Sequence, residues 1–205
     1  MNSPYEVVTA FEKKVAEYAG AKYGVAVNSC TNALMLSAIY QRETRHAGLS
    51  RVEIPKFTYV GVPYAMINAG FKIDFVDTGW HGWYTINPID VVDSARRFKR
   101  DMYIPGTLYC LSFHETKILP VGDGGMILTD DKNAYDALRQ MRFDGRTPGK
   151  SVFDDEFTLP GYHVHCKPDV ACRGIMLMAG VKDYNEDLPE TYPDLSQVPY
   201  FRSDV

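Results

Sequence analysis

The chain has 205 residues, of which 45% are hydrophobic and 23% are charged, and its formal net charge is −4. This composition is typical of a soluble globular domain and gives no reason to expect binding to nucleic acid or to an anionic membrane. No apolar run approaches the roughly 18 residues that a membrane span needs, and the first residues form neither a basic leader nor an apolar core, so we expect no signal peptide.

The basic residues and the cysteines further narrow the class of protein. The basic run within residues 96–100 lacks the extent of a nucleic-acid-binding face, and we interpret it as a solvated turn. The cysteines form no CxxC pair, so free thiols in a reducing cytoplasm are expected rather than a disulfide framework. They are Cys30, Cys110, Cys166 and Cys172.

The first predicted elements are a helix, a strand and a second helix. Residues 3–6 have the form of a capping box with proline at the first helical position, and apolar residues at helical spacing continue until Gly20. Residues 23–27 are short and rich in valine, which predicts a strand. A polar turn at residues 28–32 then leads into a helix from about Ala33 to Gln41.

The alternation continues along the chain. Strands are predicted at residues 51–55, 71–76, 89–92, 107–111 and 126–129, and helices at residues 62–69, 131–143 and 169–178. This order argues for an α/β layered fold with a largely parallel sheet. After the last helix, prolines punctuate a polar tail.

Three polar features follow predicted strands, where ligands gather in α/β sheets. Ser29-Cys30-Thr31 opens a helix whose free N–H groups favour a phosphate, although a simple helix cap explains the pattern as well. Asp93 ends an apolar strand and needs a partner, and a structural hydrogen bond to a loop is the alternative. Lys117 lies in a loop, where a lone lysine is usually surface decoration.

Taken together, these features suit one cofactor. A phosphate cradle, an aromatic ring, a carboxylate and a lysine, in this order, are what pyridoxal phosphate requires. The lysine amine bonds to the cofactor aldehyde. The carboxylate keeps the pyridine nitrogen protonated, and the aromatic face covers the ring.

Four segments also match motifs of one enzyme family. Residues 25–34 (VAVNSCTNAL) are similar to V-x-x-S-G-T-x-A-L, with Cys30 in place of the usual glycine, and residues 55–60 (PKFTYV) to P-x-x-T-F/W-V. Residues 93–95 (DSA) are similar to E-D-A-A, and residues 111–126 (LSFHETKILPVGDGGM) to F-S-F-H-x-x-K followed by G-x-G-G. These are motifs of the DegT/DnrJ/StrS family of nucleotide-sugar aminotransferases, which the chain therefore resembles.

The resemblance implies a fold and a domain organisation. The fold implied is the three-layer α/β large domain of fold-type-I pyridoxal-phosphate-dependent transferases, with a mostly parallel sheet. We expect residues 1–180 to form this domain and residues 181–205 to form a C-terminal tail, with no separate small domain. The domain is shortened, because only fifteen residues (78–92) separate Asp77 from Asp93, where the family has a further strand, a crossover helix and loops.

The resemblance also implies roles for individual residues. Lys117 is the residue that holds the cofactor covalently, and Asp93 meets its pyridine nitrogen. Tyr59 stacks on the cofactor ring. The cofactor phosphate is bound by Ser29, Cys30, Thr31 and Ser112. Arg96 stands where the family usually has Gln or His near the phenolic oxygen of the cofactor.

A last, weaker block contains His163. Residues 161–172 resemble G-x-N-x-R-x-x-x-x-x-A-A, whose Asn reaches the cofactor phosphate of the neighbouring subunit, and His163 stands at that position. The rival interpretation is a metal site made of His163, His165 and Cys166, but no second ligand cluster stands at a recognisable spacing. We therefore assign no metal.

The resemblance implies a function and leaves a second one open. The leading hypothesis is a miniature aminotransferase that moves an amino group from an amino acid to a keto-sugar nucleotide, acting as a cytoplasmic homodimer. The alternative is a relic that binds pyridoxal phosphate or a sugar nucleotide, or that pairs with a larger aminotransferase. Lys117 and Asp93 favour the enzyme, and the short interval favours the relic. Lys117 also argues against the family's dehydratase branch, which lacks this lysine.

The aromatic residues of the short interval are expected either at a subunit interface or against the chain's own sheet; they are Trp80, Trp83 and Tyr84.

Overall fold

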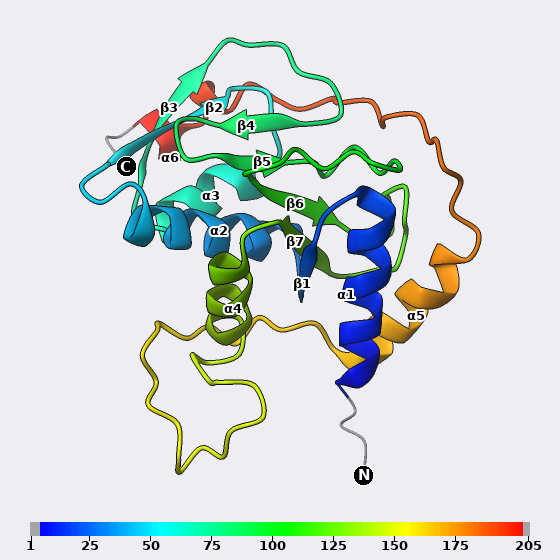
Figure 1. Ribbon diagram of the computed structural model, residues 1–205. Helices are drawn as coiled ribbons and strands as arrows, with labels where there is room; N and C mark the ends of the chain where they lie inside the picture. The colour runs from blue at the N-terminus through cyan, green and yellow to red at the C-terminus, as the bar shows by residue number, and fades with distance from the viewer. Residues whose placement is uncertain (1–4, 203–205) are drawn as a thin grey trace.

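Helices and strands alternate along the computed structural model, which describes residues 5–202 (Figure 1). The strands are β1 (Tyr23–Val27), β2 (Arg51–Pro55), β3 (Lys72–Val76), β4 (Tyr84–Ile86), β5 (Val91–Asp93), β6 (Leu108–Ser112) and β7 (Gly125–Thr129). The α-helices are α1 (Glu6–Ala19), α2 (Cys30–Thr44), α3 (Gly61–Asn68), α4 (Lys132–Met141), α5 (Pro168–Met178) and α6 (Pro199–Arg202), with a short 3-10 helix η1 (Leu195–Gln197) before α6.

Capping residues determine where α1 ends and where α2 begins. α1 ends where predicted, because Gly20 adopts the left-handed conformation (φ 83°) and donates its N–H to the Ala16 carbonyl. The capping box predicted at its start includes Ser3 and Pro4, which lie outside the described residues. α2 begins three residues earlier than predicted, because the Ser29 side chain accepts a hydrogen bond from the Asn32 N–H at 3.1 Å and so caps the helix.

The central sheet is mixed rather than uniformly parallel. Its five strands lie in the order β1-β7-β6-β5-β4, and β2 and β3 form a separate parallel pair. Within the larger sheet, β5 and β6 are parallel, whereas β1–β7, β6–β7 and β4–β5 are antiparallel. The predicted α/β class is confirmed. Parallel pairing, which was expected for most of the sheet, is limited to β5–β6 and β2–β3. A bridge between Glu53 and Asn87 joins the two sheets.

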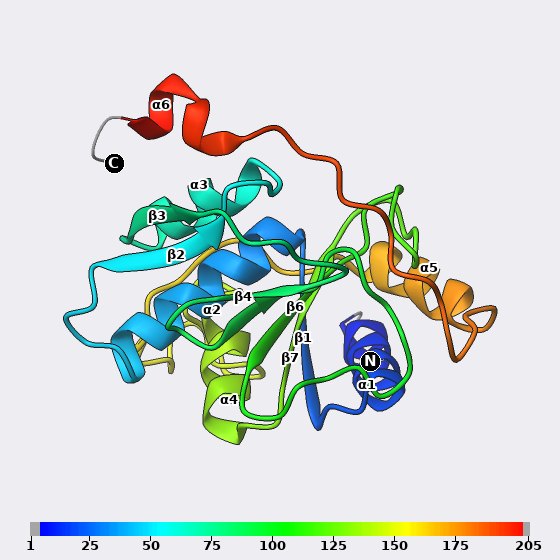
Figure 2. The same cartoon turned by 90° about the horizontal axis from the view of Figure 1, so that it is seen from above.

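Side chains alternate between the two faces of the sheet, and each face carries its own core. On β1, Val25 and Val27 belong to the core beneath α2, α3 and α4, whereas Ala26 between them belongs to the core beneath α1 and α5. Both cores contain fully buried residues, for example Ile127 on the first side and Tyr109 on the second. The sheet is therefore covered on both faces, as the three-layer expectation requires (Figures 1 and 2).

The short interval between Asp77 and Asp93 contains a strand that the sequence did not predict. β4 runs antiparallel to β5 and pairs Tyr84 with Asp93, so it fills the edge between β5 and β2. The strand predicted at residues 89–92 begins later, because Asp90 has a φ of 50° and cannot continue an extended strand. Tyr84 is buried, and Trp80 and Trp83 pack against the two cores, so the aromatic residues cover the chain's own sheet.

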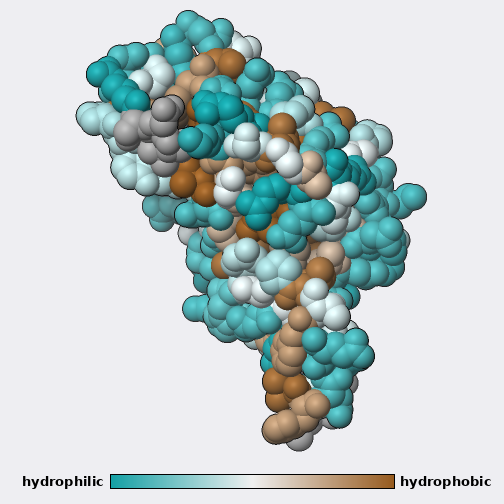
Figure 3. Space-filling view, turned by 90° about the vertical axis from the view of Figure 1, so that its left-hand side faces the viewer, coloured by the Kyte–Doolittle hydropathy of each residue, from teal (hydrophilic) through white to brown (hydrophobic). Residues whose placement is uncertain are grey.

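Two segments outside the layers bear on function. Residues 146–162 form a loop that projects from the body, with apolar side chains near its tip (Figures 1 and 3). After α5, the chain crosses the molecule beside the sheet edge and reaches α6 (Figure 2). We call residues 183–195 of this crossing the strap. Within residues 5–202, no helix combines the length and the apolar character that crossing a membrane requires.

Candidate active site

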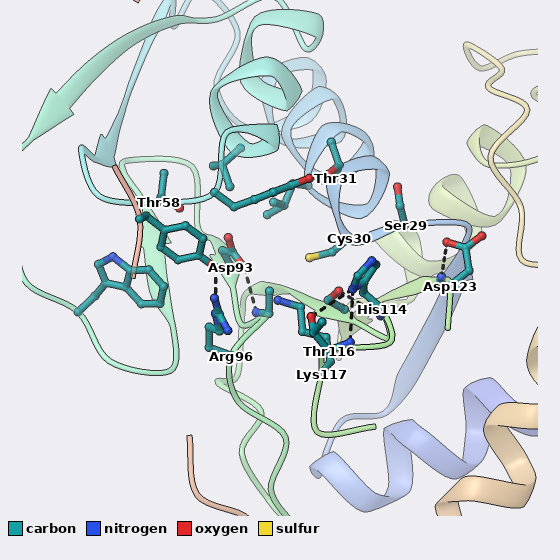
Figure 4. A pocket seen from close by; sticks show the side chains of 18 residues that line it. Ser29, Cys30, Thr31, Thr58, Asp93, Arg96, His114, Thr116, Lys117 and Asp123 are labelled. Atoms are coloured by element: carbon teal, nitrogen blue, oxygen red, sulfur yellow. Dashed lines mark hydrogen bonds between the residues drawn. The ribbon is translucent and has the colours of Figure 1, made fainter. Parts of the chain in front are cut away.

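A cavity of about 400 Å³ lies where the N-terminus of α2 meets the ends of β5 and β6 (Figure 4). Seven of the eight residues that the sequence assigned to the site line it: Ser29, Cys30, Thr31, Tyr59, Asp93, Ser112 and Lys117. They come from segments that are far apart in the sequence, and the sheet brings them together. The expectation that ligand-binding residues gather at strand ends therefore describes this chain.

The Ser29–Thr31 turn opens α2 with the backbone arrangement that suits a phosphate. The N–H groups in the first turn of an α-helix have no partner within the helix, and the helix dipole favours an anion there. The backbone of Gly125 packs directly beneath this turn, because a Cβ added to it would lie 2.6 Å from the backbone nitrogen of Cys30. The glycine pair after Lys117 thus allows β7 to approach the turn closely.

Asp93 is a buried carboxylate with two partners. One of its oxygens accepts the Ala95 N–H and the other accepts the Tyr84 hydroxyl, each at 2.9 Å. Burial raises the pKa of Asp93, and the two hydrogen bonds and the charge of Lys117 offset part of that effect. Each carboxylate oxygen has a second lone pair, so Asp93 can still accept a hydrogen bond from a cationic ring N–H.

Lys117 is half-buried in the loop after β6. Its backbone N–H donates to the His114 carbonyl, which closes a turn and directs the segment along the cavity. Burial lowers the pKa of Lys117, and the nearby guanidinium of Arg96 lowers it further. A lysine with a lowered pKa holds more of its amine in the neutral, nucleophilic form.

Cys30 replaces the family's usual glycine, and its sulfur points into the cavity (Figure 4). Burial, reinforced by the negative charge of Asp93, raises the pKa of Cys30 well above its ordinary value. The thiol is therefore neutral near pH 7. This favours an uncharged packing role over a nucleophilic one, since the thiolate is the nucleophile.

The remaining predicted residues lie at the rim or away from the cavity. Tyr59 is 56% exposed and lines the rim, so a ligand ring could stack on it. His163 does not line the cavity of its own chain: its Nδ1 lies 2.9 Å from a carboxylate oxygen of Asp144. Its role toward a neighbouring subunit stays a prediction. Among residues 5–202, no three His, Cys, Asp or Glu side chains are grouped to hold a metal, and this includes the rival cluster with His165 and Cys166.

The sequence did not identify several residues that shape the cavity. Tyr84 bridges Thr58 and Asp93, because its hydroxyl lies 2.7 Å from the Thr58 hydroxyl as well as 2.9 Å from Asp93. Tyr192 forms part of the cavity wall beside Arg96, which the resemblance already placed near the cofactor, and Trp80 stands beside Tyr192. β4, which carries Tyr84, has only three residues, too few for a clear alternation of polar and apolar side chains. No local sequence pattern indicates that Tyr192 lies beside the cavity, since it is almost 100 residues beyond Asp93 in the chain.

Two known proteins are similar to the chain in sequence. The chain is 24% identical over 245 residues to the UDP-4-amino-4,6-dideoxy-N-acetyl-beta-L-altrosamine transaminase of Campylobacter jejuni, covering 95% of this chain and 63% of that protein. It is 25% identical over 182 residues to the spore coat polysaccharide biosynthesis protein SpsC of Bacillus subtilis, covering 67% and 46%. The chain thus spans less than two thirds of the length of these relatives.

A solved structure supports the fold. The sugar aminotransferase from Micromonospora echinospora superimposes with a TM-score of 0.69 at 19% identity, over 85% of this chain and 60% of that one. An identity this low establishes the fold and nothing finer. It agrees with the fold class expected from the sequence.

The sequence model of one family matches residues 1–92 and 104–185, which is most of the chain. The interval between the matched segments contains Asp93 and Arg96, so their places in the site come from the structure. The family's cofactor is pyridoxal phosphate, and the site has a phosphate turn, a buried carboxylate and a half-buried lysine to suit it. The chain belongs to the DegT/DnrJ/EryC1/StrS aminotransferase family.

Proposed function

We propose that the chain is a pyridoxal-phosphate-dependent aminotransferase that takes an amino group from an amino acid and gives it to a keto-sugar nucleotide. The observation that carries the proposal is the convergence of Lys117, Asp93 and the Ser29–Thr31 turn on one cavity. When bound, pyridoxal phosphate supplies an aldehyde that bonds to amines and a ring that accepts the electron pair left at the reacting carbon.

The residues of the chain divide the work among them. The α2 N-terminus and Ser112 hold the phosphate, Tyr59 covers one face of the ring, and Asp93 accepts the hydrogen bond of the protonated pyridine nitrogen. Lys117 would hold the cofactor, and its free amine would carry a proton between the two reacting carbons. The lowered pKa of Lys117 suits this, because a neutral amine can accept that proton.

The substrate assignment rests on relatives. The Campylobacter jejuni relative is named as a transaminase of a UDP-linked amino sugar, and the Bacillus subtilis relative is named for polysaccharide biosynthesis. A cavity of about 400 Å³ is ample for an amino acid or for the reacting sugar beside the cofactor. We therefore propose a sugar nucleotide as the amino acceptor.

The projecting loop supports assembly into a homodimer. Phe153 is 94% exposed, and Val152 and Phe157 on the same loop are 48% exposed each. Apolar side chains gathered on a projection favour burial against a second protein surface. We propose that this surface belongs to a second copy of the chain and that the dimer acts in the cytoplasm, where its free thiols persist. Light scattering at micromolar concentration checks the dimer, and a monomer that still binds pyridoxal phosphate would refute a shared site.

A second candidate is favoured by the shortened interval before Asp93. β4 replaces the longer segment expected there, so the chain could retain the cofactor half of the site without the transfer activity. In that case it would bind pyridoxal phosphate or a sugar nucleotide, or pair with a larger aminotransferase.

One experiment separates the two candidates. The purified chain is loaded with pyridoxal phosphate and mixed with L-glutamate, and the visible absorbance is followed in a stopped-flow instrument while 2-oxoglutarate is assayed. The aminotransferase predicts that the visible band is lost and that one 2-oxoglutarate forms per site. A band that persists without product, both with L-glutamate and with the other common amino acids, would leave only the relic. Lys117→Ala is the control, and it should show neither band nor product.

A further inference from the structure

The basic run after β5 is tied to the strap. Arg97 forms an ion pair with Asp187 at 2.5 Å, and Lys99 pairs with the same carboxylate at 3.0 Å. Arg100 pairs with Asp183 at 2.7 Å. The interpretation of this run as a solvated turn is therefore wrong for Arg97 and Lys99, which meet a buried acid of the strap, whereas Arg100 and its partner Asp183 are both exposed.

Arg96, the first cation of the run, differs from the other three. Among the described residues it forms no ion pair with a carboxylate. Its Nε instead donates to the hydroxyl of Tyr192 at 2.9 Å, and its guanidinium lies 5.1 Å from the centroid of the same ring. Arg96 also lines the cavity that contains Lys117.

Tyr192 is held firmly enough to position this guanidinium. Its ring stacks on Trp80, with the centroids 6.2 Å apart and the planes 20° from parallel. The strap is attached on either side of it, because the Leu188 N–H donates to the Arg96 carbonyl and the Leu195 N–H donates to the Lys56 carbonyl, both at 2.9 Å. Burial raises the pKa of Tyr192, so its hydroxyl is neutral and does not balance the charge of Arg96.

Arg96 has room for an anion as a partner. Among the described residues, the two carboxylates that line the cavity, Asp93 and Asp123, form no ion pair with Arg96, and Asp93 acts on it only through space. Arg96 and Lys117 repel each other, and Arg96 still has four N–H groups beyond the one that Tyr192 uses. A guanidinium in this state binds an oxyanion well, and its fork matches the two oxygens of a carboxylate.

We propose that Arg96, held in place by Tyr192, binds the carboxylate of the amino-acid donor. This inference rests on the proposed function and names the group that recognises the donor. An α-amino acid carries its amine and its carboxylate on one carbon, so a cation must face the cavity in which Lys117 acts, and Arg96 does so. The cofactor phosphate has its own place at the N-terminus of α2. Even with Arg96 beside the phenolic oxygen of the cofactor, as the resemblance implies, its four remaining N–H groups suffice for a carboxylate as well.

The test measures binding of glutarate, a dicarboxylate that lacks an amine and cannot react. Isothermal titration of the chain loaded with pyridoxal phosphate should show binding, and Arg96→Gln should weaken it roughly ten- to a hundredfold, the effect of losing a hydrogen bond to a charged group. Arg45→Gln removes the same charge from a distant exposed ion pair and serves as the control, with unchanged affinity. Equal affinity of wild type and Arg96→Gln, or no binding to wild type, overturns the proposal.

Two further titrations identify the kind of anion. Inorganic phosphate and UDP replace glutarate in the same experiment. If Arg96→Gln weakens the binding of phosphate or UDP and leaves glutarate unaffected, Arg96 serves a phosphate group and the carboxylate assignment fails. The proposal predicts the reverse order of effects.

Tyr192→Phe tests the positioning role, because it keeps the ring and removes only the hydroxyl. The affinity for glutarate should fall about two- to tenfold, while the affinity for pyridoxal phosphate and the melting temperature stay at wild-type values. A purely structural role would lower the melting temperature and leave glutarate affinity unchanged. Arg96→Lys keeps the charge without the fork and should retain an intermediate affinity.

The test of Arg96 as a carboxylate site can be separated from the test of the proposed function. If the chain binds no pyridoxal phosphate, the proposed function fails, and the glutarate titrations repeated without cofactor still compare wild type with Arg96→Gln. A preserved difference would then support Arg96 as a carboxylate site, and its disappearance would overturn it.

Discussion

The two halves of the cavity differ in how the chain builds them. In the cofactor half, Ser29, Asp93 and Lys117 each follow a strand of the central sheet, and each lies in a motif readable from neighbouring residues. In the opposite half, which we call the rim half, Arg96 and Tyr192 come from the turn after β5 and from the strap. The cofactor half is thus fixed by the sheet, whereas the rim half depends on ion pairs that hold a tail segment in place.

This difference predicts which property a substitution in each half should change. A change in the cofactor half should damage the chemistry and leave the fold stable, since the sheet positions those residues through its buried core. A change that removes a buried ion pair of the strap should loosen the rim half and affect stability and substrate binding together. The predictions below test this contrast, beginning with the largest effect.

Asp93→Asn should have the largest effect on the chemistry. An amide cannot balance the charge of a protonated pyridine nitrogen, and the loss of one partner of a buried ion pair costs about 3–5 kcal/mol, which corresponds to at least about a hundredfold in rate. Single-turnover rates with L-glutamate measure this loss, and spectral titration should show that pyridoxal phosphate still binds. Asp136→Asn on the exposed face of α4 is the control. An unchanged single-turnover rate in Asp93→Asn would contradict the assignment.

Asp187→Asn should have the largest effect on the strap. The Asp187 side chain is 2% exposed and pairs with Arg97 and Lys99, so its loss should lower the free energy of unfolding by about 1–3 kcal/mol. Asp183→Asn removes a carboxylate that is 74% exposed and should change stability by less than about 0.5 kcal/mol. Urea denaturation measures both. Equal effects of the two substitutions would mean that the strap is not anchored at Asp187.

The stabilisation that Asp187 provides should depend on pH. Burial alone would raise the pKa of Asp187, but the hydrogen bonds and charges of Arg97 and Lys99 outweigh it and lower the pKa. Because the folded pKa is depressed, the stabilisation is present above the ordinary value of about 3.9 and is lost as the pH falls through the folded pKa. The stability difference between wild type and Asp187→Asn should therefore hold from neutral pH to about pH 5 and shrink in stronger acid.

Arg96→Gln should shift the pH profile of cofactor attachment. Burial first and Arg96 second lower the pKa of Lys117, so removal of the guanidinium raises that pKa and leaves less neutral amine at a given pH. The rate at which pyridoxal phosphate attaches, followed by its visible absorbance, should rise with pH in both proteins, with the profile of Arg96→Gln displaced to higher pH. An undisplaced profile would show that Arg96 and Lys117 do not interact.

Tyr84→Phe should have the smallest effect. It removes the hydroxyl between Thr58 and Asp93 while the ring stays in the core, so the expected loss of stability is about 1 kcal/mol. Thermal denaturation measures the loss. Cofactor affinity should change by only a few-fold, since Asp93 keeps the Ala95 N–H as a partner. A loss of cofactor binding as large as that in Lys117→Ala would place Tyr84 in the cofactor half itself.

The sequence predicts one half of the site far better than the other, for a physical reason. Ser29 and Lys117 lie in short segments whose hydrogen bonds are mostly local, for example the Asn32 N–H to Ser29 and the Lys117 N–H to the His114 carbonyl. Strand periodicity and glycine placement therefore reveal them. The same local rules place Gly20 at the end of α1 and residues 51–55 in β2.

Contacts between distant segments account for what the sequence did not predict. The hydrogen bond from Arg96 to Tyr192 spans 96 positions, and no periodicity in the tail indicates it. β4 has only three residues, too few for alternation to stand out from a turn rich in aromatic residues. The antiparallel pairing of β7 with β1 and β6 was also hidden, because a buried strand has the same apolar composition in either direction.

The central claim is that Lys117 holds pyridoxal phosphate in the cavity formed with Asp93 and the Ser29–Thr31 turn. The most direct test is reduction of the loaded chain with borohydride, followed by proteolysis and mass spectrometry of the labelled peptide. The account predicts one label per chain, on Lys117, and no visible absorbance band for Lys117→Ala. A label on another lysine, or a band that survives in Lys117→Ala, would contradict it.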